Sequence, residues 1–178
     1  MWGQGEGTRG YCGETSFQTH GIFYGNWISS EIARRNADGI ELLIGENDVK
    51  AATGLKFKYE KFPEDVKEDA GGEFIEWARA QIDQGHLVVH GFFDNNGTKD
   101  AYDHIMPIMG YKKDQSGKTL GLFYNDLYDF SKSRFVSAET DVQSRKECVP
   151  GETQRYCITK EAVFAIALQG NPDTGSVL

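Results

Sequence analysis

One cysteine near the start of the chain, Cys12, has surroundings that suit a nucleophile. It follows a glycine-rich stretch, residues 1–10, and precedes a segment that we expect to be helical from about Gly13. Amide groups and the positive end of a helix dipole favour the thiolate at such a position, so the pKa of the thiol would be lowered. The same amides can stabilise the oxyanion that forms when a thiolate attacks a carbonyl. The alternative is that Cys12 is a small buried apolar residue, as most lone cysteines are.

A thiolate nucleophile needs a general base and a group that orients the base. His104 opens a predicted strand after a polar loop, so its side chain would project from the end of the sheet. The next predicted strand ends in Asn125-Asp126, and either residue could accept the imidazole N–H and fix its tautomer. The other three histidines have structural interpretations in a helix interior, at a helix end and in a strand interior: His20, His86 and His90.

The hydrophobic periodicity predicts the elements that must position these residues. Helices are expected at residues 13–25, 30–35, 48–54 and 73–84, and strands at 55–59, 87–93, 104–111, 120–124, 135–142 and 156–168. The run D-Q-S-G-K at Asp114 to Lys118 predicts the turn of an antiparallel hairpin. Pro107 within the histidine strand removes a ladder donor and predicts an edge or bulged position. Helices first and strands second predict an α+β fold, with N-terminal helices packed on a mostly antiparallel β-sheet.

Four blocks of sequence follow one another in a recognisable order. They are Y-C-G-E-T-S-F-Q-T-H-G-I-F-Y-G-N-W-I-S at Tyr11 to Ser29, G-H-L-V-V-H-G at Gly85 to Gly91, D-H-I-M-P-I-M-G-Y at Asp103 to Tyr111, and G-L-F-Y-N-D-L-Y at Gly121 to Tyr128. Together they resemble the papain-like cysteine peptidases. The best match is the C39-like branch that processes bacteriocins, in which C-G-x-x-S opens a helix that ends in Y-G-x-x-I-S. The C-terminal part of the chain carries no such block.

The resemblance implies one papain-like domain over residues 1–178 and a role for each matching residue. Cys12 becomes the nucleophile, and His104 becomes the general base and later the acid. The orienting residue would be Asp126, with Asn125 as the second choice, and Gln4 would donate to the oxyanion. The sequence departs from the family at this last residue, because the family's glutamine usually stands nearer to the cysteine.

The expected activity is therefore cleavage of a peptide or other amide bond through a thioester on Cys12. If an amine intercepts the thioester instead of water, the same site is an acyltransferase of the transpeptidase or transglutaminase type. A binding protein with an unused triad is the non-catalytic alternative. The expected partner is a peptide, a protein or a small amide, and neither a cofactor nor a metal is expected.

Composition limits the other classes of function. The chain has 178 residues, enough for one domain with a sizeable core, and its net charge is −8. An acidic balance argues against nucleic acid or an anionic membrane as the main partner. No apolar run is long enough for membrane insertion, and the first residues do not have the pattern of a secretion signal. The oligomeric state stays open.

Two further cysteines, Cys148 and Cys157, flank a short polar loop with Pro150-Gly151 at its centre. Such a turn could bring the two sulfurs within bonding reach, and two reduced thiols are the equally supported alternative. A disulfide would imply an oxidising compartment, and thus a location outside the cytoplasm. A structural zinc site is disfavoured, because the C-x-x-C spacing typical of such sites is missing.

Overall fold

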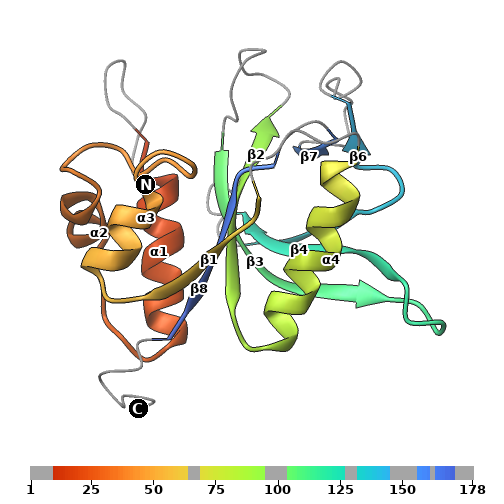
Figure 1. Ribbon diagram of the computed structural model, residues 1–178, viewed down its shortest axis with the longest axis horizontal. Helices are drawn as coiled ribbons and strands as arrows, with labels where there is room; N and C mark the ends of the chain where they lie inside the picture. The colour runs from red at the N-terminus through yellow and green to blue at the C-terminus, as the bar shows by residue number, and fades with distance from the viewer. Residues whose placement is uncertain are drawn as a thin grey trace.

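The computed structural model describes residues 10–63, 69–94, 104–126, 132–144, 156–160 and 163–170 (Figure 1). Its helices are α1 (Cys12–Phe23), α2 (Ser30–Asn36), α3 (Asp48–Gly54) and α4 (Ala70–Asp83). Its strands are β1 (Lys58–Lys61), β2 (Leu87–Asp94), β3 (His104–Lys113), β4 (Thr119–Asp126), β5 (Lys132–Ser137), β6 (Val142–Gln143), β7 (Tyr156–Thr159) and β8 (Ala165–Gln169).

The strands form a sheet with the order β1-β8-β2-β3-β4-β5. Every pair along this path is antiparallel, and a short branch adds β7 to the end of β2 and β6 beside β7 in parallel. The predicted α+β class and the mostly antiparallel sheet are confirmed. β8 lies between β1 and β2, so the last strand of the chain is inserted between the first two (Figure 1).

Helices cover both faces of this sheet, and each face has its own hydrophobic core. The three N-terminal helices lie on one side and α4 lies on the other (Figure 1). Successive side chains of a strand point to opposite faces, so neighbours such as Ile105 and Met106 belong to different cores. Ile105 packs with Phe17 of α1, whereas Met106 packs with Phe74 of α4.

The end of α1 and the start of α2 are set by neighbouring residues in the chain. Gly25 follows α1 with a φ of +77°, a left-handed conformation that glycine adopts without strain. The Ser29 side chain accepts a hydrogen bond of 3.2 Å from the Ile32 amide and caps α2. A Cβ on Gly21 would come within 2.7 Å of the Ile28 side chain, so the glycine lets the two segments approach closely.

Several predicted boundaries differ from the structure. α4 begins at Ala70 instead of residue 73, because Asp69 caps it through the Gly72 amide. β1 begins at Lys58 instead of residue 55, since α3 runs to Gly54 and a turn follows it. The predicted strands at 135–142 and 156–168 are each divided: a turn at 138–141 separates β5 from β6, and β7 and β8 pair with different parts of the sheet.

The prediction for Pro107 is half wrong. β3 is an interior strand between β2 and β4, so Pro107 is not at an edge. The registered pairs between β3 and β4 begin only at Ile108, and a register shift follows between Ile108 and Gly110. On the β4 side the proline therefore precedes the paired part of the strand, next to a bulge, where a missing donor is tolerated. Within the described ranges, no helix is both long enough and apolar enough to span a bilayer.

Candidate active site

Cys12 is the first residue of α1 and lies against the first residues of β3. The Ile105 backbone donates a hydrogen bond to its sulfur, as does the Gly13 backbone. Ser16, one turn later in α1, also links the helix to β3: its hydroxyl lies 2.8 Å from the Cys12 carbonyl and 3.4 Å from the Ile105 carbonyl. The sulfur is therefore held beside the residue that directly follows His104 in the chain.

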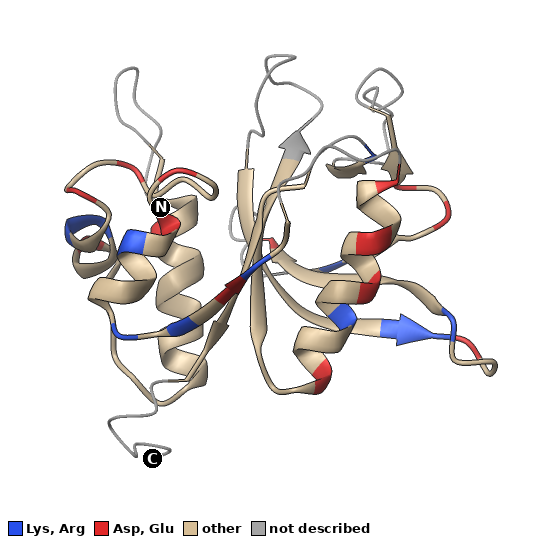
Figure 2. Cartoon of the chain, in the orientation of Figure 1, with Lys and Arg blue, Asp and Glu red and all other residues tan. Residues whose placement is uncertain are grey.

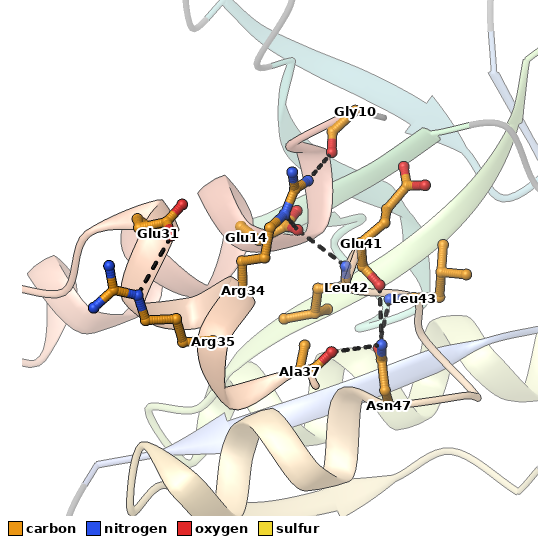
Figure 3. Close-up of polar contacts among 10 residues, drawn as sticks. All are labelled: Gly10, Glu14, Glu31, Arg34, Arg35, Ala37, Glu41, Leu42, Leu43 and Asn47. Carbon is orange, nitrogen blue, oxygen red and sulfur yellow. Dashed lines mark hydrogen bonds and ion pairs between the residues drawn. The ribbon is translucent and has the colours of Figure 1, made fainter. Parts of the chain in front are cut away.

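The loop after α2 packs against the start of α1. A Cβ on Gly13 would lie 2.3 Å from the Leu42 carbonyl oxygen, so only glycine leaves room for this backbone. The loop itself is fastened by Asn47, which donates to the Glu41 carbonyl at 2.9 Å and accepts from the Leu43 amide at 2.8 Å (Figure 3). This close packing gives the backbone at the start of α1 little freedom.

The lowered thiol pKa expected from the helix start is wrong for this environment. The pKa of Cys12 is raised from 9.0 to about 11, mainly by burial and in smaller part by the carboxylates of Glu41 and Glu14. The Ile105 and Gly13 backbone hydrogen bonds act in the opposite direction and are outweighed. The resting thiol is therefore protonated at neutral pH.

His104 is the first residue of β3 and is buried, with 1% of its surface exposed. Its ring lies 5.8 Å from the ring of Tyr156, centroid to centroid. Tyr156 belongs to the core on the α4 side, and strand alternation assigns His104 to that side together with Met106. The imidazole and the thiol thus approach the end of β3 from its two faces.

Asp126 shares the face of His104, whereas Asn125 does not. Asp126 lies two residues after Tyr124, which belongs to the α4-side core and pairs with Ile108 of β3. Because β3 and β4 are antiparallel, the end of β4 lies near the start of β3. Asp126 is fully buried and accepts a 2.9 Å hydrogen bond from the Arg134 guanidinium, a partner that the sequence pattern did not indicate.

Asn125 projects to the opposite face of β4 by alternation. Its Oδ1 is buried and has no hydrogen-bond partner among the described residues.

Gln4, the expected oxyanion donor, lies outside the described residues. Cys148 does as well, so its pairing with Cys157, which is buried in β7, stays a prediction.

An ion pair close to Cys12 is a feature that sequence reasoning missed. Glu14 is fully buried in the first turn of α1, and its Oε1 accepts from Arg34 Nε at 2.7 Å and from the Leu42 amide at 3.0 Å (Figure 3). Arg34 also donates through Nη2 to the Gly10 carbonyl, and its guanidinium lies 3.5 Å from the Tyr11 ring centroid. Acids are common in first turns and Arg34 is on another helix, so no spacing could reveal the pair.

The remaining histidines lie in the elements where the sequence predicts them. The buried His20 ring bonds the Ser16 carbonyl at 2.7 Å through Nδ1, and burial lowers its pKa to about 4. His86 bonds Gln81 at 2.8 Å after the end of α4. His90 lies between Phe74 and Phe92, with ring centroids at 4.4 and 4.1 Å, and burial lowers its pKa to about 3.

Acidic residues and lysine or arginine are spread over both helices and strands, and α4 carries several acids (Figure 2). In the part of the chain that the structure describes, no three His, Cys, Asp or Glu side chains are grouped so that they could hold a metal ion. No known protein-family model matches this chain, and no curated protein matches it either.

Proposed function

We propose that the chain is a cysteine hydrolase of the papain-like type that cleaves a peptide or other amide bond. Cys12 is the nucleophile, His104 is the general base and Asp126 orients the imidazole. The observation that carries the proposal is the packing of the start of α1 on the start of β3, where the Ser16 hydroxyl lies 2.8 Å from the Cys12 carbonyl and 3.4 Å from the Ile105 carbonyl, so that Cys12 lies near the residue next to His104. The common face of His104 and Asp126 supports the third role and favours Asp126 over Asn125.

The raised pKa of Cys12 determines how the reaction must begin. Because the resting thiol is protonated, the proton has to pass to His104 as the sulfur attacks the carbonyl, which is general-base catalysis and not attack by a preformed thiolate. The S–C bond forms, the carbonyl π electrons move to oxygen, and the oxyanion is stabilised by the Cys12 amide. This amide is one of the first donors of α1 and needs no partner within the helix.

The second half of the reaction returns the site to its starting state. His104 gives the proton to the departing amine as the C–N bond breaks, which leaves a thioester on Cys12. Water, deprotonated by His104, then attacks the thioester and releases the acid and the thiol. Gln4 stays the predicted second oxyanion donor.

Turnover of a fluorogenic casein and of a mixture of short peptide amides tests this proposal. Wild-type protein should cleave one of them, and Cys12→Ala should lose all cleavage with a melting temperature within a few degrees of wild type. Cys12→Ser is the matched variant, because it keeps the shape and the backbone contacts but is a weaker nucleophile. Cleavage that persists in Cys12→Ala contradicts the proposal. Adding a primary amine and weighing the products separates hydrolysis from acyl transfer.

A binding protein with an unused triad is the second candidate, and two observations favour it. The pKa of Cys12 is raised, opposite to what an activated thiol needs, and His104 is almost fully buried. This candidate predicts that Cys12 reacts with an activated ester no faster than a free thiol of the same pKa. A hydrolase predicts faster acylation that depends on His104.

A further inference from the structure

Arg34 contacts the chain on both sides of Cys12. On the N-terminal side it donates to the Gly10 carbonyl and stacks on the Tyr11 ring at 3.5 Å. On the C-terminal side it pairs with Glu14 at 2.7 Å. Its own side chain is 15% exposed, so the contacts form in a largely desolvated setting where hydrogen bonds to charged groups are strong.

The three contacts need the particular shape of a guanidinium. The planar fork offers separate N–H groups to the Glu14 carboxylate and to the Gly10 carbonyl, while its flat face rests on Tyr11. A lysine ammonium has the same charge but no flat face and no fork. It can replace the charge and cannot replace the geometry.

A buried ion pair is a weak source of stability, because the desolvation of two charges offsets most of their attraction. The Glu14–Arg34 pair does, however, restrict position. Glu14 also accepts the Leu42 amide at 3.0 Å, so the same carboxylate joins α1, α2 and the loop that packs on Gly13. The pair thereby connects α1, α2, the residue Gly10 before α1 and the loop at Leu42 (Figure 3).

We propose that Arg34 is a positioning residue for Cys12, holding the nucleophile in its reactive place through Gly10 and Tyr11 before it and Glu14 after it. This inference rests on the proposed hydrolase function. Arg34 acts only through these neighbours and does not contact the reacting atoms. Its role is to keep the sulfur aligned at the end of β3 while the substrate carbonyl arrives.

The test compares Arg34→Lys with wild type and with Arg35→Gln. Arg35 is the next residue of α2, and its pair with Glu31 at 3.4 Å is exposed, so Arg35→Gln removes a similar charge that has no contact with the α1 start (Figure 3). Two rates are measured for each protein: acylation of Cys12 by p-nitrophenyl acetate, and modification of Cys12 by 2,2′-dithiodipyridine across pH. The pH dependence of the second rate gives the pKa of Cys12 and from it the thiolate fraction, by which both rates are divided.

Arg34→Lys should reduce the acylation rate per thiolate about tenfold, because misplacement of the sulfur by a fraction of an ångström lowers the rate of attack. Its melting temperature should stay within a few degrees of wild type, and Arg35→Gln should match wild type in both rates. A purely structural role would change the melting temperature and leave the rate of the folded protein unaltered. Equal acylation rates in folded Arg34→Lys and wild type would overturn the proposal.

A double variant covers the case in which Arg34→Lys fails to fold. Glu14→Gln with Arg34→Gln removes both buried charges, so no uncompensated charge remains. It should show the same loss of acylation rate per thiolate, and an unchanged rate overturns the proposal.

Failure of the hydrolase function gives a different result. In that case wild-type Cys12 is acylated no faster than a free thiol of the same pKa. The dithiodipyridine rate, divided by the thiolate fraction, then tests by itself whether Arg34 positions Cys12. A changed value in Arg34→Lys supports the positioning role, and an unchanged value overturns it.

Discussion

Cys12 should react slowly with a neutral disulfide reagent at neutral pH, because burial raises the pKa of its thiol to about 11 from 9.0. At pH 7 the thiolate fraction is then about 10⁻⁴, against about 10⁻² for an unperturbed thiol. A more basic thiolate is a better nucleophile, with a Brønsted coefficient near 0.45, so each Cys12 thiolate should be about eightfold more reactive. The smaller thiolate fraction and the higher reactivity of each thiolate together make the modification of Cys12 about tenfold slower than that of an exposed cysteine.

The assay follows 2,2′-dithiodipyridine from about pH 6 to about pH 10 and identifies the modified peptide by mass. The rate should rise about tenfold per pH unit over this whole range, since the thiolate fraction does. Glu41→Gln removes a carboxylate that raises the pKa of Cys12, so it should increase the rate at every pH below 9. Glu46→Gln is the control, because Glu46 is an exposed acid of the same loop and does not act on the thiol. A rate that stays level below pH 8 would mean that the thiolate already exists beside an imidazolium, and would refute the reasoning.

Three further outcomes are expected. Gly13→Ala should lose about 1–3 kcal/mol of its free energy of unfolding through overpacking and melt at a clearly lower temperature, because the new Cβ meets the Leu42 carbonyl oxygen at 2.3 Å. Gly110→Ala is the control and should melt like wild type, because a Cβ there meets nothing within 4 Å. Asp126→Asn should lower kcat by two orders of magnitude or more, about what loss of an orienting carboxylate costs, while Asn125→Ala should stay within a few-fold; equal losses would contradict the assignment. The free energy of unfolding should fall between pH 6.5 and about pH 4, by about 3 kcal/mol for each of His20 and His90, because both pKa values are lowered in the folded state and the unfolded chain binds more protons. His90→Phe should weaken this fall in acid titrations followed by circular dichroism.

Local sequence signals were enough to predict most elements of the fold. The helix over Cys12–Phe23, the hairpin turn at Asp114 to Lys118 and the strand beginning at His104 follow from periodicity, capping and turn residues. These features depend on contacts within a few residues of the chain. Boundaries set by distant contacts were missed, as at α4, where Gly71 packs against Val142 and Thr159.

The contacts around Cys12 could be predicted from the sequence only in part. That β8 inserts between β1 and β2 depends on long-range pairing that no local pattern encodes. The pKa of Cys12 depends on burial and on the carboxylates of Glu41 and Glu14, so a rule based on the helix start gave the wrong sign. The common face of His104 and Asp126 could have been found by counting alternate residues along β3 and β4.

In the proposed mechanism, Cys12 and His104 act as nucleophile and base across the end of β3. Acylation of Cys12 by p-nitrophenyl acetate, measured near pH 7 in wild type and in His104→Gln, tests it most directly. We expect His104→Gln to acylate at least about a hundredfold more slowly, because a half-buried thiol with a raised pKa then has no group to accept its proton. Equal acylation rates in the two folded proteins would show that the imidazole does not serve this thiol, and would contradict the account.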